Sequence, residues 1–129
     1  MELKINFLGE NRDADFQDWA SEEATSLKND IRFYLPEAET KQPSKTINIG
    51  EAGGVFDSVV KVLFGQEFLE KILDIFRTWI EQRGVILAAK KPKIQITIKD
   101  DKGIEKNITL EGNFNNVKEL VEQLKSILQ

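Results

Sequence analysis

The chain has no cysteine and no histidine among its 129 residues. Without cysteine there are no disulfides, no thiolate nucleophile and no cysteine–metal site. Without histidine the chain lacks the usual general base and the commonest transition-metal ligand. We therefore expect no catalytic residues, no metal site and no bound cofactor, and we predict that the protein is not an enzyme.

The chain also lacks long apolar runs and an excess of positive charge. No charge-free apolar segment approaches ~18 residues, so no membrane span is expected. The first residues lack the basic start and apolar run of a secretion signal, so we expect a cytoplasmic protein. The formal net charge is −4. This charge argues against nucleic acid as a partner, because phosphate binding needs a concentrated positive field.

What the chain does contain is typical of a globular protein. Hydrophobic residues make up 40% and charged residues 31% of the sequence, which are ordinary proportions. The length suits one domain over residues 1–129 with a core of its own.

The longest segment with periodic apolar residues covers residues 53–83, and the flanking elements are expected to cover it. At 100° per residue, the apolar side chains before Gly65 and those after it form two helical faces whose centres lie about 200° apart. An unbroken helix would also be about 45 Å long, too long for a compact domain of this size. Either the chain breaks at Gly65 and both faces turn to one core, or the helix continues and one face meets another chain.

The N-terminal part predicts a strand, a helix and a second strand. Apolar and polar residues alternate over residues 3–7, and Asp13 or Asp15 can cap the helix that follows. Residues 31–35 predict the second strand, and this order favours a parallel pair joined by a right-handed crossover. Residues 36–50 then read as a polar loop.

The C-terminal third predicts a hairpin and a helix. Isoleucines alternate with polar residues over residues 94–98, the segment 100–103 makes the turn, and residues 104–110 return. A leucine-rich helix over residues 117–128 follows, while Gly84 is expected to end the central helix. The predicted fold is α+β, a two-layer sandwich in which helices pack a four-stranded mixed sheet in the order β-α-β-α-α-β-β-α.

The glycine-rich segment before the central helix has two interpretations. Backbone N–H groups at Gly50, Gly53 and Gly54 could hold an anion at a helix N-terminus. The segment lacks the ending of a phosphate loop, and Glu51 would repel an anion. The alternative is a flexible start to the helix.

A candidate protein interface lies on the apolar face after Gly65, and it consists of Phe68, Ile72, Ile75 and Trp79. Core packing is the ordinary role of such a face, but if exposed it would be an aromatic-rich anchor of the kind that dominates interfaces. The central segment also carries more large apolar side chains than a sheet with one open face would cover. We therefore expect a protein partner, either an effector encoded nearby or a second copy of the chain.

The order of these elements resembles a bacterial protein family. The segments DFQDWASEE, GEAG, FRTWIEQR and ITIKDDKGIEKNITL are similar to those of the effector-associated constant component family of small α+β proteins. The resemblance covers residues 3–128 and includes no catalytic motif. It implies an adaptor or regulatory component that acts beside a protease or NTPase effector in a bacterial conflict or immunity system. A second hypothesis is a sensor domain that binds an anionic ligand or nucleotide at the 50–54 glycine turn.

Overall fold

The computed structural model describes residues 1–8, 12–48, 55–111, 122 and 126. Within them the chain forms five strands, three α-helices and one short 3-10 helix η1. Their bounds are β1 (Glu2–Leu8), α1 (Ala14–Tyr34), β2 (Glu39–Asn48), β3 (Val55–Leu63), η1 (Gln66–Phe68), α2 (Leu69–Gln82), α3 (Gly84–Lys90), β4 (Lys93–Lys99) and β5 (Glu105–Glu111).

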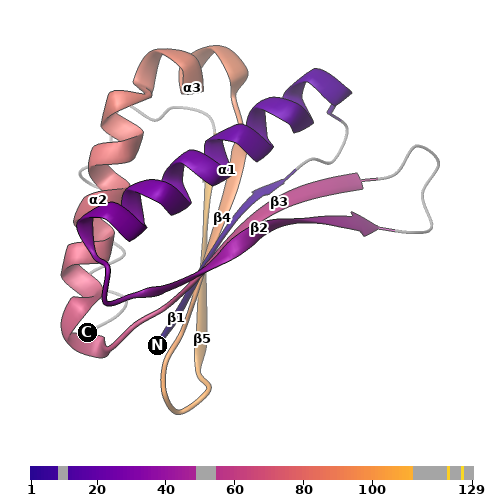
Figure 1. The fold of residues 1–129 in the computed structure, drawn as a ribbon. Helices are drawn as coiled ribbons and strands as arrows, with labels where there is room; N and C mark the ends of the chain where they lie inside the picture. The colour runs from indigo at the N-terminus through magenta and orange to yellow at the C-terminus, as the bar shows by residue number, and fades with distance from the viewer. Residues whose placement is uncertain (9–11, 49–54, 112–121, 123–125, 127–129) are drawn as a thin grey trace.

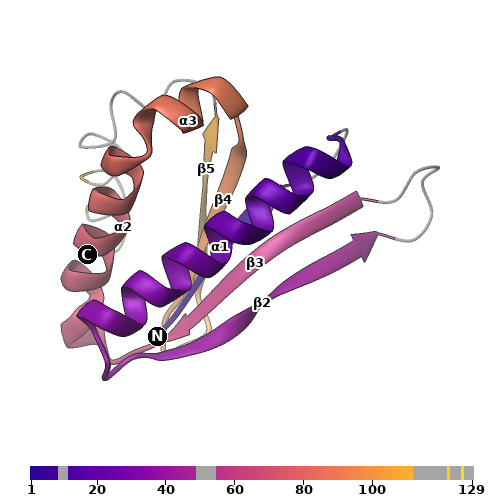
Figure 2. The same ribbon diagram turned by 45° about the horizontal axis from the view of Figure 1, so that its top comes forward.

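The strands form one antiparallel sheet in the order β2-β3-β1-β4-β5. The helices α1, α2 and α3 lie on the same side of this sheet (Figures 1 and 2). The predicted α+β class is confirmed, but the four-stranded mixed sheet is wrong. The predicted parallel pair of strands does not form either, because residues 31–34, which were expected in its second strand, belong to helix α1.

Residues 55–63 form strand β3 instead of the predicted helix. This segment contains four valines, whose branched side chains favour the extended backbone of a strand. Val60 and Val62 are fully buried in the core. The chain then breaks at Gly65, whose backbone is extended, before η1 and α2 begin. The break is one of the two alternatives drawn from the sequence, and both flanks of Gly65 contribute to one core.

Helix α1 continues through residues 31–34, where the sequence predicted a strand. Leu27, Ile31 and Leu35 follow each other at helical spacing and are all fully buried. Tertiary packing of this stripe against the sheet therefore outweighs the strand pattern of the short segment. The predicted cap is confirmed, since the carboxylate of Asp13 accepts a hydrogen bond from the backbone N–H of Phe16 at 2.8 Å.

Strand β2 occupies most of the predicted loop over residues 36–50. It lies at one edge of the described sheet and pairs only with β3, with a register shift between Lys41 and Ser44. Pro43 falls within this shift, a position where a missing N–H is tolerated. Backbone hydrogen bonding to β3 thus makes a strand out of a segment with few apolar residues.

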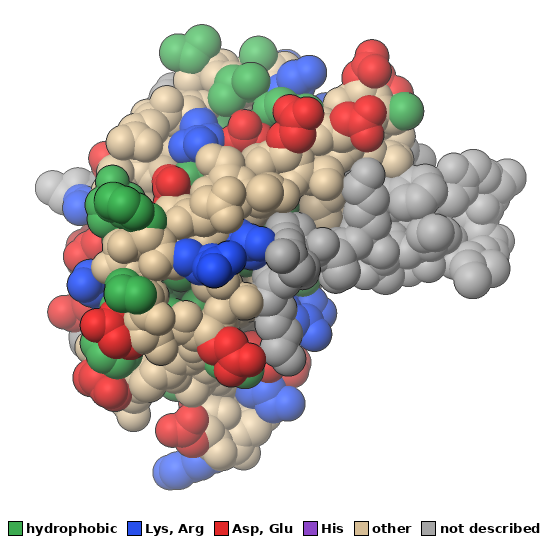
Figure 3. All heavy atoms as spheres, in the orientation of Figure 1, with side chains coloured by type: hydrophobic (Ala, Val, Ile, Leu, Met, Phe, Trp, Pro, Cys, Tyr) green, Lys and Arg blue, Asp and Glu red, His purple; other side chains and the backbone are tan. Residues whose placement is uncertain are grey.

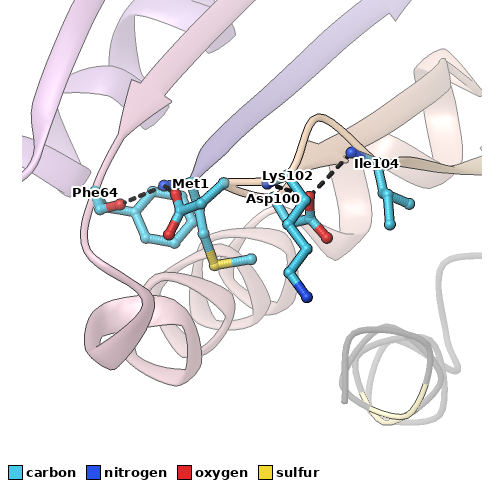
Figure 4. Close-up of polar contacts among 6 residues, drawn as sticks. Met1, Phe64, Asp100, Lys102 and Ile104 are labelled. Atoms are coloured by element: carbon cyan, nitrogen blue, oxygen red, sulfur yellow. Dashed lines mark hydrogen bonds and ion pairs between the residues drawn. The ribbon is translucent and has the colours of Figure 1, made fainter.

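The C-terminal hairpin is confirmed as β4 and β5. Gly103 takes a positive φ of 83° in the turn. The carboxylate of Asp100 accepts hydrogen bonds from the backbone N–H groups of Lys102 and Ile104, both at 2.9 Å (Figure 4). The amino group of Met1 donates to the carbonyl oxygen of Phe64 at 2.8 Å beside this turn.

Two further predictions concern residues after α2. Gly84 does not end a helix but is the first residue of α3, which continues to Lys90. The residue with left-handed backbone at the end of α3 is Lys91, with φ 49°. The predicted helix over residues 117–128 falls almost entirely outside the described residues.

Two glycine substitutions should change stability in opposite directions. Gly103→Ala forces a Cβ into positive φ, so we expect the free energy of unfolding to fall by about 1–2 kcal/mol. Gly84→Ala, in a helix with open space around the new Cβ, should raise it by about 0.4–1 kcal/mol. Urea unfolding followed by circular dichroism measures both, and equal effects of the two changes would contradict the described backbone.

Candidate functional site

A groove lies between the C-terminal half of α1 and helix α2. Its volume is about 290 Å³. Asp30 and Tyr34 of α1 line one wall. The other wall is a stripe of α2 at i, i+4 spacing, formed by Lys71, Ile75 and Trp79.

Two aromatic residues lie at the end of α1: Tyr34 lines the groove, and Phe33 packs against Tyr34. Phe33 is 78% exposed and Tyr34 is 56% exposed. Their rings make an edge-to-face contact with centroids 5.0 Å apart, so each limits the other's movement. Figure 3 shows hydrophobic side chains at the surface where the end of α1 meets α2. The groove therefore has an aromatic rim that the chain's own core does not cover.

The groove also carries charges of both signs. Asp74 pairs with Arg77 at 4.0 Å in an exposed position, where such pairs contribute little. The side chains of Asp30 and Lys71 make no ion pair within the described part of the chain. The carboxylate of Asp30 on the α1 wall and the ammonium of Lys71 on the α2 wall can therefore both interact with a bound group.

Trp79 forms the inner wall of the groove and is only 1% exposed. Its ring packs edge-to-face on Phe7 with centroids 5.9 Å apart and stacks with Phe76 at 6.2 Å. The guanidinium of Arg83 lies over the same ring, 4.7 Å from its centroid. Aromatic contacts on several sides thus fix the indole and keep the groove's wall rigid.

Arg83 also joins the two helices that form the groove. Its Nε donates to the carboxylate of Glu23 at 2.6 Å, and a terminal nitrogen donates to the hydroxyl of Ser26. Glu23 and Ser26 belong to α1, while Arg83 follows the last residue of α2. We call this set, Arg83 with Glu23 and Ser26, the Arg83 clasp. It fixes the spacing of the helices at one end of the groove.

The four residues predicted for a protein interface separate in the structure. Ile72 and Trp79 are buried in the core, and Phe68 and Ile75 are partly buried against it. Only Ile75 and Trp79 line the groove, so the four together do not form an exposed anchor. Gly50, Gly53 and Gly54, the predicted anion site, lie outside the described residues.

The α1 wall of the groove, formed by Asp30 and Tyr34, was not predicted from the sequence. Residues 31–35 were assigned to a strand, which hid the fact that Asp30 and Tyr34 lie one turn apart on a helix. The available signal was the spacing of Leu27, Ile31 and Leu35. Continued as a helix, that spacing puts Phe33 on the side opposite the buried stripe, about 160° from its centre, and puts Tyr34 at the edge of the stripe.

The described residues contain no cluster of acidic side chains able to hold a metal ion. None of the described helices is long and apolar enough to cross a membrane.

No protein-family model matches the chain, and neither does any curated protein. Among solved structures it is similar to a phage SAM lyase in complex with S-methyl-5'-thioadenosine, with 11% identity and a TM-score of 0.39. The match covers 88% of this chain and 90% of that one. A phage SAM lyase in the apo state matches with 9% identity, a TM-score of 0.36 and the same coverage. At these TM-scores the likeness carries no argument about function.

The Arg83 clasp should contribute more to stability than the exposed pair on α2. In a double-mutant cycle, Arg83→Ala and Glu23→Ala should show a coupling energy of about 1–2 kcal/mol, because the pair is mostly buried and hydrogen-bonded. The matched cycle for Arg77 and Asp74 should give about 0.5 kcal/mol or less. Urea unfolding supplies all the values. Equal coupling in the two cycles would show that Arg83 does not join α1 to α2.

Proposed function

We propose that this chain is a non-enzymatic adaptor that binds an effector protein through the groove between α1 and α2. The observation that supports this proposal is the exposed aromatic pair Phe33–Tyr34 at the rim of the groove. Tyrosine and other aromatic residues are enriched among the side chains that dominate interface energies. An aromatic rim beside a rigid apolar wall is the arrangement that such anchors use.

The groove suits one segment of a partner better than a whole small ligand. Its volume of about 290 Å³ lies at the lower limit of ligand pockets, which run from about 300 to 1,000 Å³. A large apolar side chain of the partner would lie between Tyr34, Ile75 and Trp79. A basic side chain beside it would face the carboxylate of Asp30, which has no ion-pair partner among the described residues.

The biological setting comes from the family resemblance. Members of that family act beside variable effectors, so the proposed partner is the protease or NTPase encoded next to this chain in a bacterial conflict system. The adaptor would hold the effector without altering it covalently. This fits a groove that contains neither histidine nor cysteine.

Substitutions at the rim should weaken binding to that effector. We expect Tyr34→Ser to raise the dissociation constant at least about tenfold, equivalent to ~1.4 kcal/mol, and Asp30→Asn to raise it by a smaller factor. Isothermal titration calorimetry with the purified product of the adjacent effector gene measures both.

The matched control is Ile104→Ser, in the turn between β4 and β5. The side chain of Ile104 is 55% exposed, close to the 56% of Tyr34. This variant should bind as the wild type does. Equal weakening by Tyr34→Ser and Ile104→Ser would place the binding surface elsewhere. No binding of the wild-type chain to the effector would remove the proposed function.

A further inference from the structure

The two edge strands of the described sheet differ in their protection against pairing with another chain. β2, at one edge, has a register shift between Lys41 and Ser44, and Pro43 lies inside it. Both features hinder the addition of a further strand. β5, at the other edge (Figure 2), pairs with β4 alone among the described strands. Its register runs without a shift from Glu105 to Glu111, and it contains no proline.

The backbone of β5 is also accessible. Five of its seven residues are exposed, Ile108 is partly buried and only Leu110 is buried. In an antiparallel pair, every second residue turns its N–H and C=O groups toward the same neighbouring strand. The remaining residues of β5 therefore direct their N–H and C=O groups away from β4. Such an edge can form backbone hydrogen bonds with an extended segment of another protein.

The side chains of β5 differ between the two faces of the sheet. Glu105 and Glu111 lie on the face opposite the helices, and both are exposed. Neither glutamate makes an ion pair within the described part of the chain. On the helix side, Leu110 belongs to the core and Ile108 packs against it. An added strand would thus meet one acid near each end on one face and apolar side chains on the other.

The neighbouring strand β4 shows which sequence complements β5. Its sequence is KIQITIK. Lys93 lies opposite Glu111, Lys99 lies opposite Glu105, and two isoleucines lie opposite the two apolar residues of β5. Opposed pairs of this kind stabilise a sheet. Because a strand presents the same side chains to both of its neighbours, the pattern of β4 also suits the outer edge of β5.

We propose that β5 binds an extended segment of a protein partner, which adds to the sheet as a further antiparallel strand. The segment has seven residues, with a basic residue at each end and apolar residues at alternate positions between them. Its backbone pairs with the outer edge of β5. Its basic side chains pair with Glu105 and Glu111, and an apolar side chain covers the exposed part of Ile108.

A second copy of the chain suits this edge less well. If two β5 strands paired antiparallel over their full length, Glu105 of each copy would lie opposite Glu111 of the other. In a parallel pair each glutamate would lie beside the same glutamate of the other copy. Like charges directly opposite each other destabilise a sheet. The charges of β5 therefore favour a basic partner segment over self-association.

This edge is separate from the proposed effector groove, which is lined by residues of α1 and α2 and by none of β5. The inference therefore does not rest on the proposed function. An adaptor with a groove between two helices and an unprotected strand edge could hold two segments at once.

Fluorescence anisotropy with a labelled peptide of sequence KIQITIK tests the charge pattern. The wild-type chain should bind this peptide saturably. The same peptide with Lys93→Glu and Lys99→Glu should bind about tenfold more weakly or worse, because both of its ends then face glutamates.

Two N-methylated forms of the peptide test the backbone pairing. One form carries methyl groups on the backbone nitrogens of Gln95 and Thr97, and the other on those of Ile96 and Ile98. Only one of these sets of N–H groups can face β5. One form should therefore lose about tenfold or more in affinity, and the other less than about threefold. Equal losses in the two forms would overturn the proposal.

Variants of the chain locate the binding site. Glu105→Gln/Glu111→Gln should weaken binding of KIQITIK about fivefold or more. The control Glu22→Gln/Glu37→Gln removes two exposed glutamates from α1 and from the segment before β2, and it should weaken binding less than about twofold. Both doubles change the net charge equally. In hydrogen exchange followed by NMR, the peptide should protect the amides of alternate residues in β5 and none in β2.

Four further results would overturn the proposal: no binding of KIQITIK to the wild-type chain, equal weakening in the two doubles, protection in β2 instead of β5, or a dimer of the chain that the peptide dissociates. The last result would assign the edge to a second copy. Glu105→Gln/Glu111→Gln should leave effector binding at the groove unchanged, so the two proposals fail separately.

Discussion

The pairing of β3 with β1 decides which side chains reach the core and which face outward. The two strands are antiparallel, from Glu2 opposite Leu63 to Phe7 opposite Ser58. In this register Val60 and Val62 point to the same side as Leu3, Ile5 and Phe7, and all of them are buried. Because strand side chains alternate, a slip of one residue would reverse every position. The same register brings Lys61 opposite Lys4 on the other side of the sheet.

The helices then have one face of the sheet to cover, and their packing creates the groove. Helix α1 buries its stripe against the sheet, while α2 adds Ile72, Phe76 and Trp79 to the same core. Asp30 and Tyr34 of α1 line one wall of the gap that this packing leaves between the two helices, and Lys71 and Ile75 of α2 line the other. The Arg83 clasp holds the other end of the helix pair. The core and the groove therefore both depend on this strand pairing.

The parts of the fold that could be predicted from the sequence are those in which local pattern and packing agree. Strands β1 and β4 alternate strictly between buried and more exposed residues, and Gly103 suits the positive φ of the turn after β4. Asp13 at the start of α1 has the side chain that a helix cap needs. Each of these signals lies within a few residues of the structure that it specifies.

The parts that could not be predicted depend on distant residues. The valine-rich segment 55–63 satisfies a helical period almost as well as a strand period, and its pairing with β1 decides the outcome. β2 is a strand because β3 supplies partners for its backbone hydrogen bonds. The polar sequence of β2 does not indicate a strand by itself. The groove needs α1 and α2 side by side, and the sheet needs a register between strands that are distant in the chain. Neither relation is visible in a linear sequence.

Cross-linking across β1 and β3 tests this register most directly, since the natural chain has no cysteine to compete. In the double variant Lys4→Cys/Lys61→Cys the two residues lie directly opposite, within the Cα separation of about 4.4–6.8 Å that a disulfide requires. In Lys4→Cys/Leu63→Cys they are diagonal neighbours, which lie about 7–8 Å apart. Mild oxidation followed by mass spectrometry should show an intramolecular disulfide in the first variant and free thiols in the second. A disulfide in the second variant but not in the first would contradict the strand pairing on which the core and the groove depend.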